Sequence, residues 1–144
     1  MQAADRIIAA QAVSLAALAW PGRPRWDLPR SLALLAAAAT AGGATFSVHG
    51  ARPHGRLLTP RVDPPSEATL LSRGPYAISR HPVYTGLLVA AAGVATLRRR
   101  PEPAIAWVAL AVVLTIKTGR EEQRLVARFG EDYVRYRERT RRFL

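Results

Sequence analysis

Apolar positions in this chain are gathered into four blocks without charged residues. The blocks are residues 7–20, 31–48, 82–97 and 103–116. Each block is apolar on every side, whereas a helix on the surface of a soluble protein shows one polar face. A charge near the centre of a bilayer costs about 2.5 to 3.5 kcal/mol, so a membrane selects stretches without charges. The pattern therefore predicts four helices that lie in a membrane.

The blocks are short for membrane spans. A spanning helix needs roughly 17 to 25 apolar residues, a length that only the block at 31–48 reaches. Blocks of the other lengths also occur as core helices of soluble proteins. Side chains that favour the lipid–water interface nevertheless flank the blocks, namely Trp20, Trp26, Arg98 and Lys117. We therefore expect an all-α fold, an integral membrane bundle of about four short transmembrane helices in a single domain over residues 1–144.

Charged residues fill the gaps between the blocks. The chain has a net charge of +11, although 49% of its residues are apolar. A nucleic-acid-binding domain would spread its positive charge over amphipathic elements, so this segregated pattern argues against such a protein. Asp5 beside Arg6, without a positively charged start, argues against a cleaved signal peptide at the first block.

The distribution of Lys and Arg predicts the orientation. With four spans, both termini and the loop at 49–81 lie on one side of the membrane. That side carries 15 Lys and Arg residues and the other side carries 6. The positive-inside rule then places the loop and the C-terminus in the cytoplasm. The Ala- and Arg-rich composition favours a prokaryotic plasma membrane.

Several kinds of active site are excluded or unexpected. The chain has no cysteine, which excludes disulfides, thiolate nucleophiles and cysteine-bound metals. Its histidines lack the spacing of a zinc site, so no metal is expected. There is also no Gly-x-Ser-x-Gly elbow, phosphate-binding P-loop or G-x-G-x-x-G motif.

The first candidate site is the segment at 74–86, with the sequence GPYAISRHPVYTG. Pro82 suits the first turn of a helix, where its missing N–H costs nothing. Free N–H groups at a helix N-terminus attract anions, so one interpretation is a cytosol-facing pocket for an anionic or nucleotide-like ligand. The alternative is a tight basic helix cap in which Tyr76 and Tyr84 are interface anchors.

The second candidate site is the segment at 117–124, KTGREEQR, at the end of the fourth block. One interpretation is that a glutamate of the pair Glu121 and Glu122 accepts hydrogen bonds from a ribose diol or an amino group. The alternative is a solvated network of surface ion pairs that contributes little energy. If the third and fourth blocks form a hairpin through residues 98–102, the two candidate sites meet.

The tail at 117–144 has the pattern of an amphipathic helix. Aromatic and aliphatic residues lie on one predicted face, namely Leu125, Phe129, Tyr133 and Tyr136. Arginines form a second stripe, which suits a helix on an anionic lipid surface. Gly130 is expected to end one helix before Glu131 and Asp132 begin another.

Taken in order, these motifs resemble the isoprenylcysteine carboxyl methyltransferase family, which belongs with the membrane phospholipid methyltransferases. The resemblance covers about residues 58–144. It lies in Gly-x-Tyr, His-Pro-x-Tyr-x-Gly, a membrane hairpin, Glu-Glu and Phe-Gly-Glu-Asp-Tyr-x-x-Tyr. It implies that S-adenosyl-L-methionine binds at the cytoplasmic end of the last membrane helices, under the loop and the tail.

The resemblance also implies which residues line the cofactor site. The stretch from Ala68 to Leu71 would contribute mostly backbone contacts. The implied cofactor-binding residues are Leu70, Leu71, Tyr76, His81, Pro82, Tyr84, Glu121 and Glu122. Lys117 falls where the family has a substrate-side arginine, and either Lys117 or Arg80 could hold an anionic nucleophile. Lysine offers a point charge in place of a two-pronged clamp, so the acceptor need not be a prenylcysteine carboxylate.

The expected function is therefore a methyltransferase whose acceptor is a lipophilic small molecule that enters from the bilayer. The residues also allow two alternatives. One is an NADPH-dependent membrane reductase of the sterol reductase type, which shares parts of the tail pattern. The other is a non-catalytic membrane scaffold. The identity of the acceptor and the oligomeric state do not follow from the residues.

Overall fold

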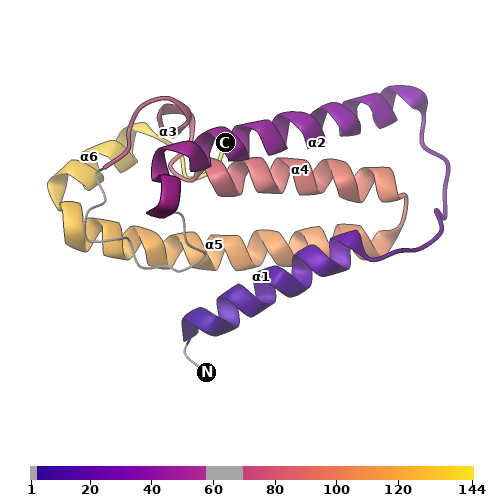
Figure 1. Ribbon diagram of the computed structural model, residues 1–144, viewed down its shortest axis with the longest axis horizontal. Coiled ribbons are helices and arrows are strands. Elements are labelled where there is room, and N and C mark those ends of the chain that lie inside the picture. Colours follow the sequence, from indigo (N-terminus) through magenta and orange to yellow (C-terminus); the bar gives the residue numbers. More distant parts are fainter. Residues whose placement is uncertain (1–2, 58–69) are drawn as a thin grey trace.

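The computed structural model describes residues 3–57 and 70–144, and this part of the chain is helical without any strand (Figure 1). The all-α fold class is therefore confirmed for the described residues. The elements are α1 (Ala3–Ala19), α2 (Arg30–Ala51), the 3-10 helix η1 (Arg52–Leu57), α3 (Pro75–Ile78), α4 (Pro82–Arg98), α5 (Pro101–Phe129) and α6 (Glu131–Arg139).

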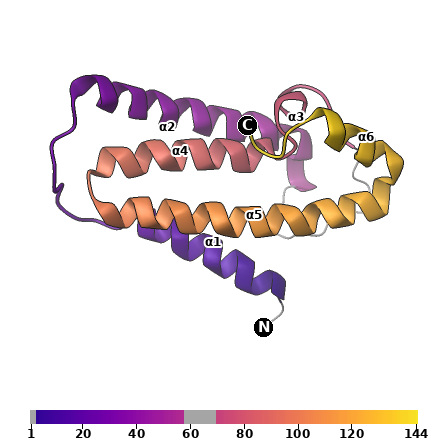
Figure 2. The same ribbon diagram turned by 180° about the vertical axis from the view of Figure 1, so that it is seen from behind.

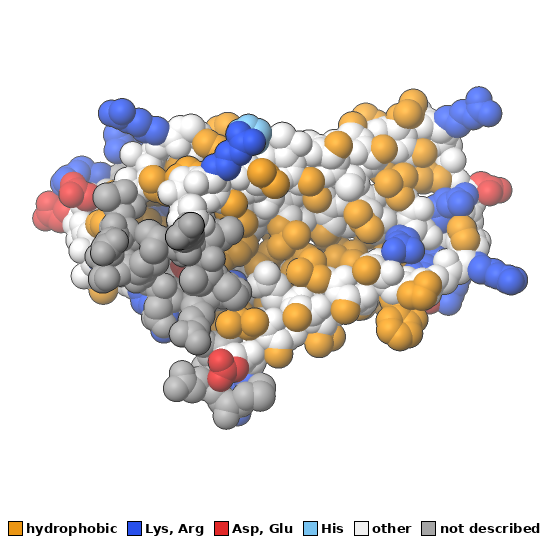
Figure 3. Space-filling model, viewed as in Figure 1, with side chains coloured by type: hydrophobic (Ala, Val, Ile, Leu, Met, Phe, Trp, Pro, Cys, Tyr) orange, Lys and Arg blue, Asp and Glu red, His pale blue; other side chains and the backbone are white. Residues whose placement is uncertain are grey.

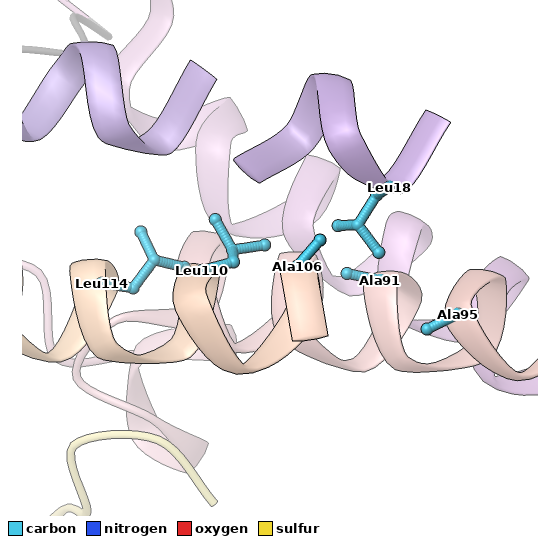
Figure 4. Packing of buried hydrophobic residues seen from close by; sticks show 6 residues of the cluster. All are labelled: Leu18, Ala91, Ala95, Ala106, Leu110 and Leu114. Carbon is cyan, nitrogen blue, oxygen red and sulfur yellow. The ribbon is translucent and has the colours of Figure 1, made fainter. Parts of the chain in front are cut away.

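The four long helices form a layered arrangement. Helix α4 lies between α2 and α5, and α1 crosses the other side of α5, as Figures 1 and 2 show from opposite directions. A small apolar core joins α1, α4 and α5 (Figure 4); its residues are Leu18, Ala91, Ala95, Ala106, Leu110 and Leu114. Small alanines in this core let the helix backbones approach each other closely.

Helices α2 and α4 pack through glycines. A Cβ atom built on Gly86 would lie 2.4 Å from both the carbonyl oxygen of Gly43 and the backbone nitrogen of Ser47. A Cβ on Gly43 would lie 2.5 Å from the nitrogen of Ala90. The hydroxyl of Ser47 adds a 2.9 Å hydrogen bond to the carbonyl of Val83. Gly86 therefore serves the contact with α2, which its position inside a candidate site did not reveal.

The helix boundaries follow local chemistry. Pro82 and Pro101 each occupy the first turn of a helix, which confirms the expected role of Pro82. Arg99, with a φ of 55°, turns the chain between α4 and α5, so the expected hairpin forms. Gly130, also with a φ of 55°, separates α5 from α6, which confirms the predicted break in the tail.

The described parts of the loop expected at 49–81 contain helical turns. Helix α2 runs on to Ala51, η1 follows it, and α3 forms a single turn before α4. The α3 turn fits its sequence, because Gly74 takes a φ of 61° and Pro75 then occupies the first helical position.

Long apolar helices support a place in a membrane. Two helical stretches, Arg30–Gly55 and Pro101–Phe129, are long and apolar enough to cross a membrane, and Pro82–Arg98 is apolar but shorter. Large apolar side chains on α5 point outward, among them Ile105, Val108, Val112 and Ile116. Figure 3 shows apolar side chains along the middle of the helices, with most Lys and Arg toward the two ends. The count of four spans remains a prediction.

Candidate functional site

The hairpin of α4 and α5 brings the two candidate sites of the sequence together. Tyr84, in the first turn of α4, donates a hydrogen bond of 2.7 Å from its hydroxyl to Glu121 on α5. His81, which precedes α4, places its Nε2 atom 3.2 Å from Oε1 of Glu122. The convergence that the sequence implied only through an assumed hairpin is thus present in the structure.

Glu121 lies on the more accessible side of this junction. Its side chain is 14% exposed, and its Oε2 atom is 3.5 Å from Nδ1 of His81. The rings of His81 and Tyr84 stack with their centroids 5.9 Å apart and their planes 19° apart. One carboxylate and two parallel rings therefore share a single corner of the hairpin.

Glu122 has a different environment from its neighbour. It is buried, and it pairs with the guanidinium groups of Arg80 and Arg142 as well as with His81. Arg142 donates to both carboxylate oxygens, at 3.1 Å from Nε and 2.8 Å from Nη2. These hydrogen bonds raise the pKa of the Arg142 guanidinium above its ordinary value. Glu122 is therefore the centre of a cluster that joins α5, the residues before α4 and the C-terminal segment (residues 140–144).

The C-terminal segment is hydrogen-bonded to the residues that precede α4. The backbone N–H of Arg80 donates to the carbonyl of Arg141 at 2.9 Å. The hydroxyl of Ser79 bonds the carbonyl of Arg142 at 2.9 Å and the hydroxyl of Thr85 at 2.8 Å. The Arg80–Arg141 and Ser79–Arg142 contacts each join residues about 60 positions apart in the sequence. The contact with Thr85 holds the hydroxyl of Ser79 in place. The tail thereby covers the start of α4.

Tyr76 also joins the residues before α4 to the tail. Its carbonyl accepts a 2.6 Å hydrogen bond from the hydroxyl of Tyr136 on α6. Its own hydroxyl donates to the carbonyl of Gly50 at 3.0 Å and bonds Nε2 of His54 at 2.5 Å. Burial raises the pKa of Tyr136 to about 12, so this phenol is neutral at physiological pH. Tyr76 therefore links α2, α3 and α6.

The two cations expected to hold a nucleophile have separate surroundings. Lys117, on α5, is buried where α5 packs against α1. Its ammonium donates to Gln11 at 3.0 Å and lies 5.0 Å from the centroid of the Tyr84 ring. Arg80 instead donates to Glu122 and to the carbonyls of Arg137 and Thr140, at 2.8 and 2.9 Å. Lys117 thus borders the corner that holds Tyr84, whereas Arg80 belongs to the cluster around Glu122.

The remaining predicted residues precede or begin α4. Pro82 is buried in the first turn of α4, against Gly50 of α2. Leu70 and Leu71 are half-buried in the segment before α3. Ala68 lies outside the described residues.

Two residues that contact the site were not predicted from the sequence. Arg142 was counted only among the tail arginines, and nothing in its neighbours distinguishes it from them. Gln11 did carry a signal, because it is a polar residue inside an uncharged apolar block. A polar group in such a block usually has a partner on another helix.

A cleft opens beside the cluster around Glu122. It has a volume of about 440 Å³ and is lined by Gly119, Glu122, Gln123, Val126, Arg137 and Arg142. Clefts that hold small molecules range from about 300 to 1,000 Å³. Among residues 3–57 and 70–144, no three His, Asp or Glu side chains gather as a metal site would require.

The chain matches one family model, which is described as phospholipid methyltransferase. The match covers residues 32–132, which is more than half of the chain and includes both candidate sites. No curated protein sequence and no solved structure matches the chain significantly. The family match confirms the relationship that the motifs indicated.

Proposed function

Because the chain belongs to the phospholipid methyltransferase family, we propose that it transfers a methyl group from S-adenosyl-L-methionine to a small or lipophilic acceptor at the membrane. The observation that carries this proposal is the corner where Tyr84, Glu121 and His81 meet. The family match does not support a reductase or a scaffold.

The residues at this corner suit the chemistry of the proposed cofactor. The cofactor offers a ribose diol and an ammonium group as hydrogen-bond donors, and the carboxylate of Glu121 accepts such donors. Its adenine and its positively charged sulfonium both favour contact with aromatic rings, which Tyr84 and His81 provide. Its carboxylate favours an arginine, and Arg137 lines the neighbouring cleft. In addition, the hydroxyl of Tyr133 is buried without a hydrogen-bond partner among the described residues.

The bound cofactor would supply a methyl group on a positively charged sulfur, which leaves as a neutral thioether. The leaving group needs no proton, so the task of the protein is to align the acceptor with the methyl group and to exclude water. The tail that covers the start of α4 suits the exclusion of water. A carboxylate or thiolate acceptor would need no general base.

Lys117 is the cation that we propose to hold an anionic acceptor. Its ammonium lies beside the ring of Tyr84, next to the corner with Glu121. Arg80 was an equal candidate on sequence grounds, but its guanidinium already bonds Glu122 and two carbonyls of the tail. An acceptor that arrives from the bilayer would meet Lys117 at the contact between α1 and α5.

We also propose that the site faces the cytoplasm of a prokaryotic cell. The support is the excess of Lys and Arg in the loop and tail, which the positive-inside rule assigns to that side. Exposed arginines of α5 and α6 suit an anionic lipid surface; they include Arg120, Arg124, Arg135 and Arg139. The cytosol would then supply the polar cofactor, and the bilayer would supply the acceptor.

Ligand-dependent stabilisation of the detergent-purified protein tests the proposed activity. S-adenosylhomocysteine and NADPH are compared at equal concentrations in thermal unfolding. A ligand at 100 times its dissociation constant stabilises the folded state by about 2.7 kcal/mol. We expect S-adenosylhomocysteine alone to raise the unfolding temperature. A shift with NADPH alone would favour the reductase, and no shift from folded protein would favour the scaffold.

A further inference from the structure

Both carboxylate oxygens of Glu122 are in contact with charged or polar side chains of the protein. Its Oε1 atom accepts from Nε of Arg80 and from Nε of Arg142, each at 3.1 Å. The same atom lies 3.2 Å from Nε2 of His81. Its Oε2 atom accepts from Nη2 of Arg142 at 2.8 Å. A buried carboxylate with so many charged donors is suited to fixing those donors in place rather than to receiving a ligand.

Arg142 is the member of this cluster that comes from the end of the chain. Its guanidinium donates one hydrogen bond to each oxygen of Glu122, and this two-pronged contact fixes the orientation of both groups. The backbone around it is also held, because the carbonyl of Arg142 accepts from Ser79 and that of Arg141 accepts from Arg80. The position of Arg142 is therefore set by more than its own side chain.

Arg142 and His81 contact the same oxygen atom of Glu122. Oε1 of Glu122, which Arg142 binds, also faces Nε2 of His81. The opposite nitrogen of the same ring, Nδ1, faces Glu121. An imidazole with Nε2 toward one carboxylate and Nδ1 toward the other is held in a single orientation, and its ring then stacks on Tyr84.

We propose that Arg142 is a positioning residue of the cofactor site, which acts through Glu122 on the imidazole of His81. This inference rests on the proposed function for its binding readout. It reassigns Glu122 from a cofactor ligand to the group that transmits the position of the tail. It also gives the last residues of the chain a role in the site.

The test compares two neighbouring arginines. Arg142→Gln removes the paired guanidinium, whereas Arg141→Gln removes an exposed guanidinium of equal charge and keeps the backbone. We expect Arg142→Gln to weaken the binding of S-adenosylhomocysteine about tenfold or more, by analogy with the loss seen when the hydrogen-bonded partner of a metal-binding side chain is removed. Arg141→Gln should bind as the wild type does. Arg142→Lys should recover part of the affinity, because it restores the charge without the two-pronged geometry.

A double-mutant cycle tests the route through Glu122. If Arg142 acts only through that carboxylate, adding Arg142→Gln to Glu122→Gln should weaken binding little beyond Glu122→Gln alone. If the fold-loss in affinity of the double variant equals the product of the two single losses, Arg142 acts by another route and the inference is overturned. Equal affinity of Arg142→Gln and the wild type would overturn it as well.

The imidazole of His81 provides a readout that needs no ligand. Nitrogen NMR of histidine-labelled protein distinguishes His81 from His49 and His54 by comparison with a His81→Gln variant. We expect Arg142→Gln and Glu122→Gln, but not Arg141→Gln, to change the ring nitrogen shifts of His81. An unchanged His81 spectrum in Arg142→Gln would refute the positioning role. If Arg142→Gln changes the His81 spectrum but the wild-type protein does not bind S-adenosylhomocysteine, the proposed function is refuted and the positioning role is retained.

Discussion

The hydroxyl of Tyr84 donates a 2.7 Å hydrogen bond to Glu121, and this contact joins the first turn of α4 to the polar end of α5. Adjacent Glu122 instead faces Arg80, His81 and Arg142. The acidic pair is thus divided into one glutamate at the ring-lined corner and one inside an ion cluster.

Replacing Glu121 with glutamine should abolish the binding of S-adenosylhomocysteine and leave the fold intact. The amide keeps the size of the side chain but removes the charge that a ribose diol or an ammonium group would meet. His81→Ala should also abolish binding, because the stacked ring is lost. Titration calorimetry measures the affinity, and circular dichroism checks the helices. Glu138→Gln, at an exposed site on α6, is the matched control. Wild-type affinity in Glu121→Gln would contradict the site assignment.

Two adjacent glycines of α2 should respond differently to replacement by alanine. A methyl group on Gly43 would lie 2.5 Å from the backbone of Ala90, whereas one on Gly42 would meet no atom within 4 Å. Overpacking of this kind typically costs about 1 to 3 kcal/mol. Removing a glycine from a helix interior gains about 0.5 to 1 kcal/mol. We therefore expect Gly43→Ala to lower the unfolding temperature and Gly42→Ala to leave it unchanged or raise it. The same direction in both variants would refute the tight packing of α2 on α4.

The contact between Gln11 and Lys117 should be visible as a stability effect. Gln11→Leu removes the oxygen that accepts from the buried ammonium, and the loss of a hydrogen bond to a charged group costs about 1.5 to 3 kcal/mol. Replacing both partners, in Gln11→Leu with Lys117→Met, should recover most of that loss, because no buried charge remains unpaired. Chemical unfolding in detergent measures both variants. Additive losses would show that the two side chains do not interact.

Tyr136 should contribute to loss of stability at alkaline pH. Burial raises its pKa in the folded protein to about 12 from an ordinary value of 10. Its contribution is therefore complete below pH 10 and is lost as the pH rises through 12, because the unfolded chain ionises first. A shift of this size corresponds to roughly 2 to 3 kcal/mol. Tyr136→Phe should be less stable than the wild type at pH 8, yet its stability should fall less between pH 8 and pH 12. Parallel pH profiles would contradict the burial of this hydroxyl.

The residues alone determined the helices and several of their ends. Charge-free blocks marked the apolar parts of α1, α2, α4 and α5, because a bilayer or a packed core rejects unpaired charges. Pro82 marked the start of α4, and Gly130 marked the break between α5 and α6. These features are local, so neighbouring residues suffice to predict them. The order of the motifs was also enough to indicate the family.

The tertiary structure decided which residues meet. Glu121 and Glu122 are consecutive, and only the packing of α5 shows which one faces Tyr84 and which one faces Arg142. Gln11 reaches Lys117 across 106 positions of sequence. Successive side chains on a helix point in directions about 100° apart, so a shift of one position changes the partner completely. The helices follow from local chemistry, whereas the site depends on contacts between distant segments, which no local pattern of residues encodes.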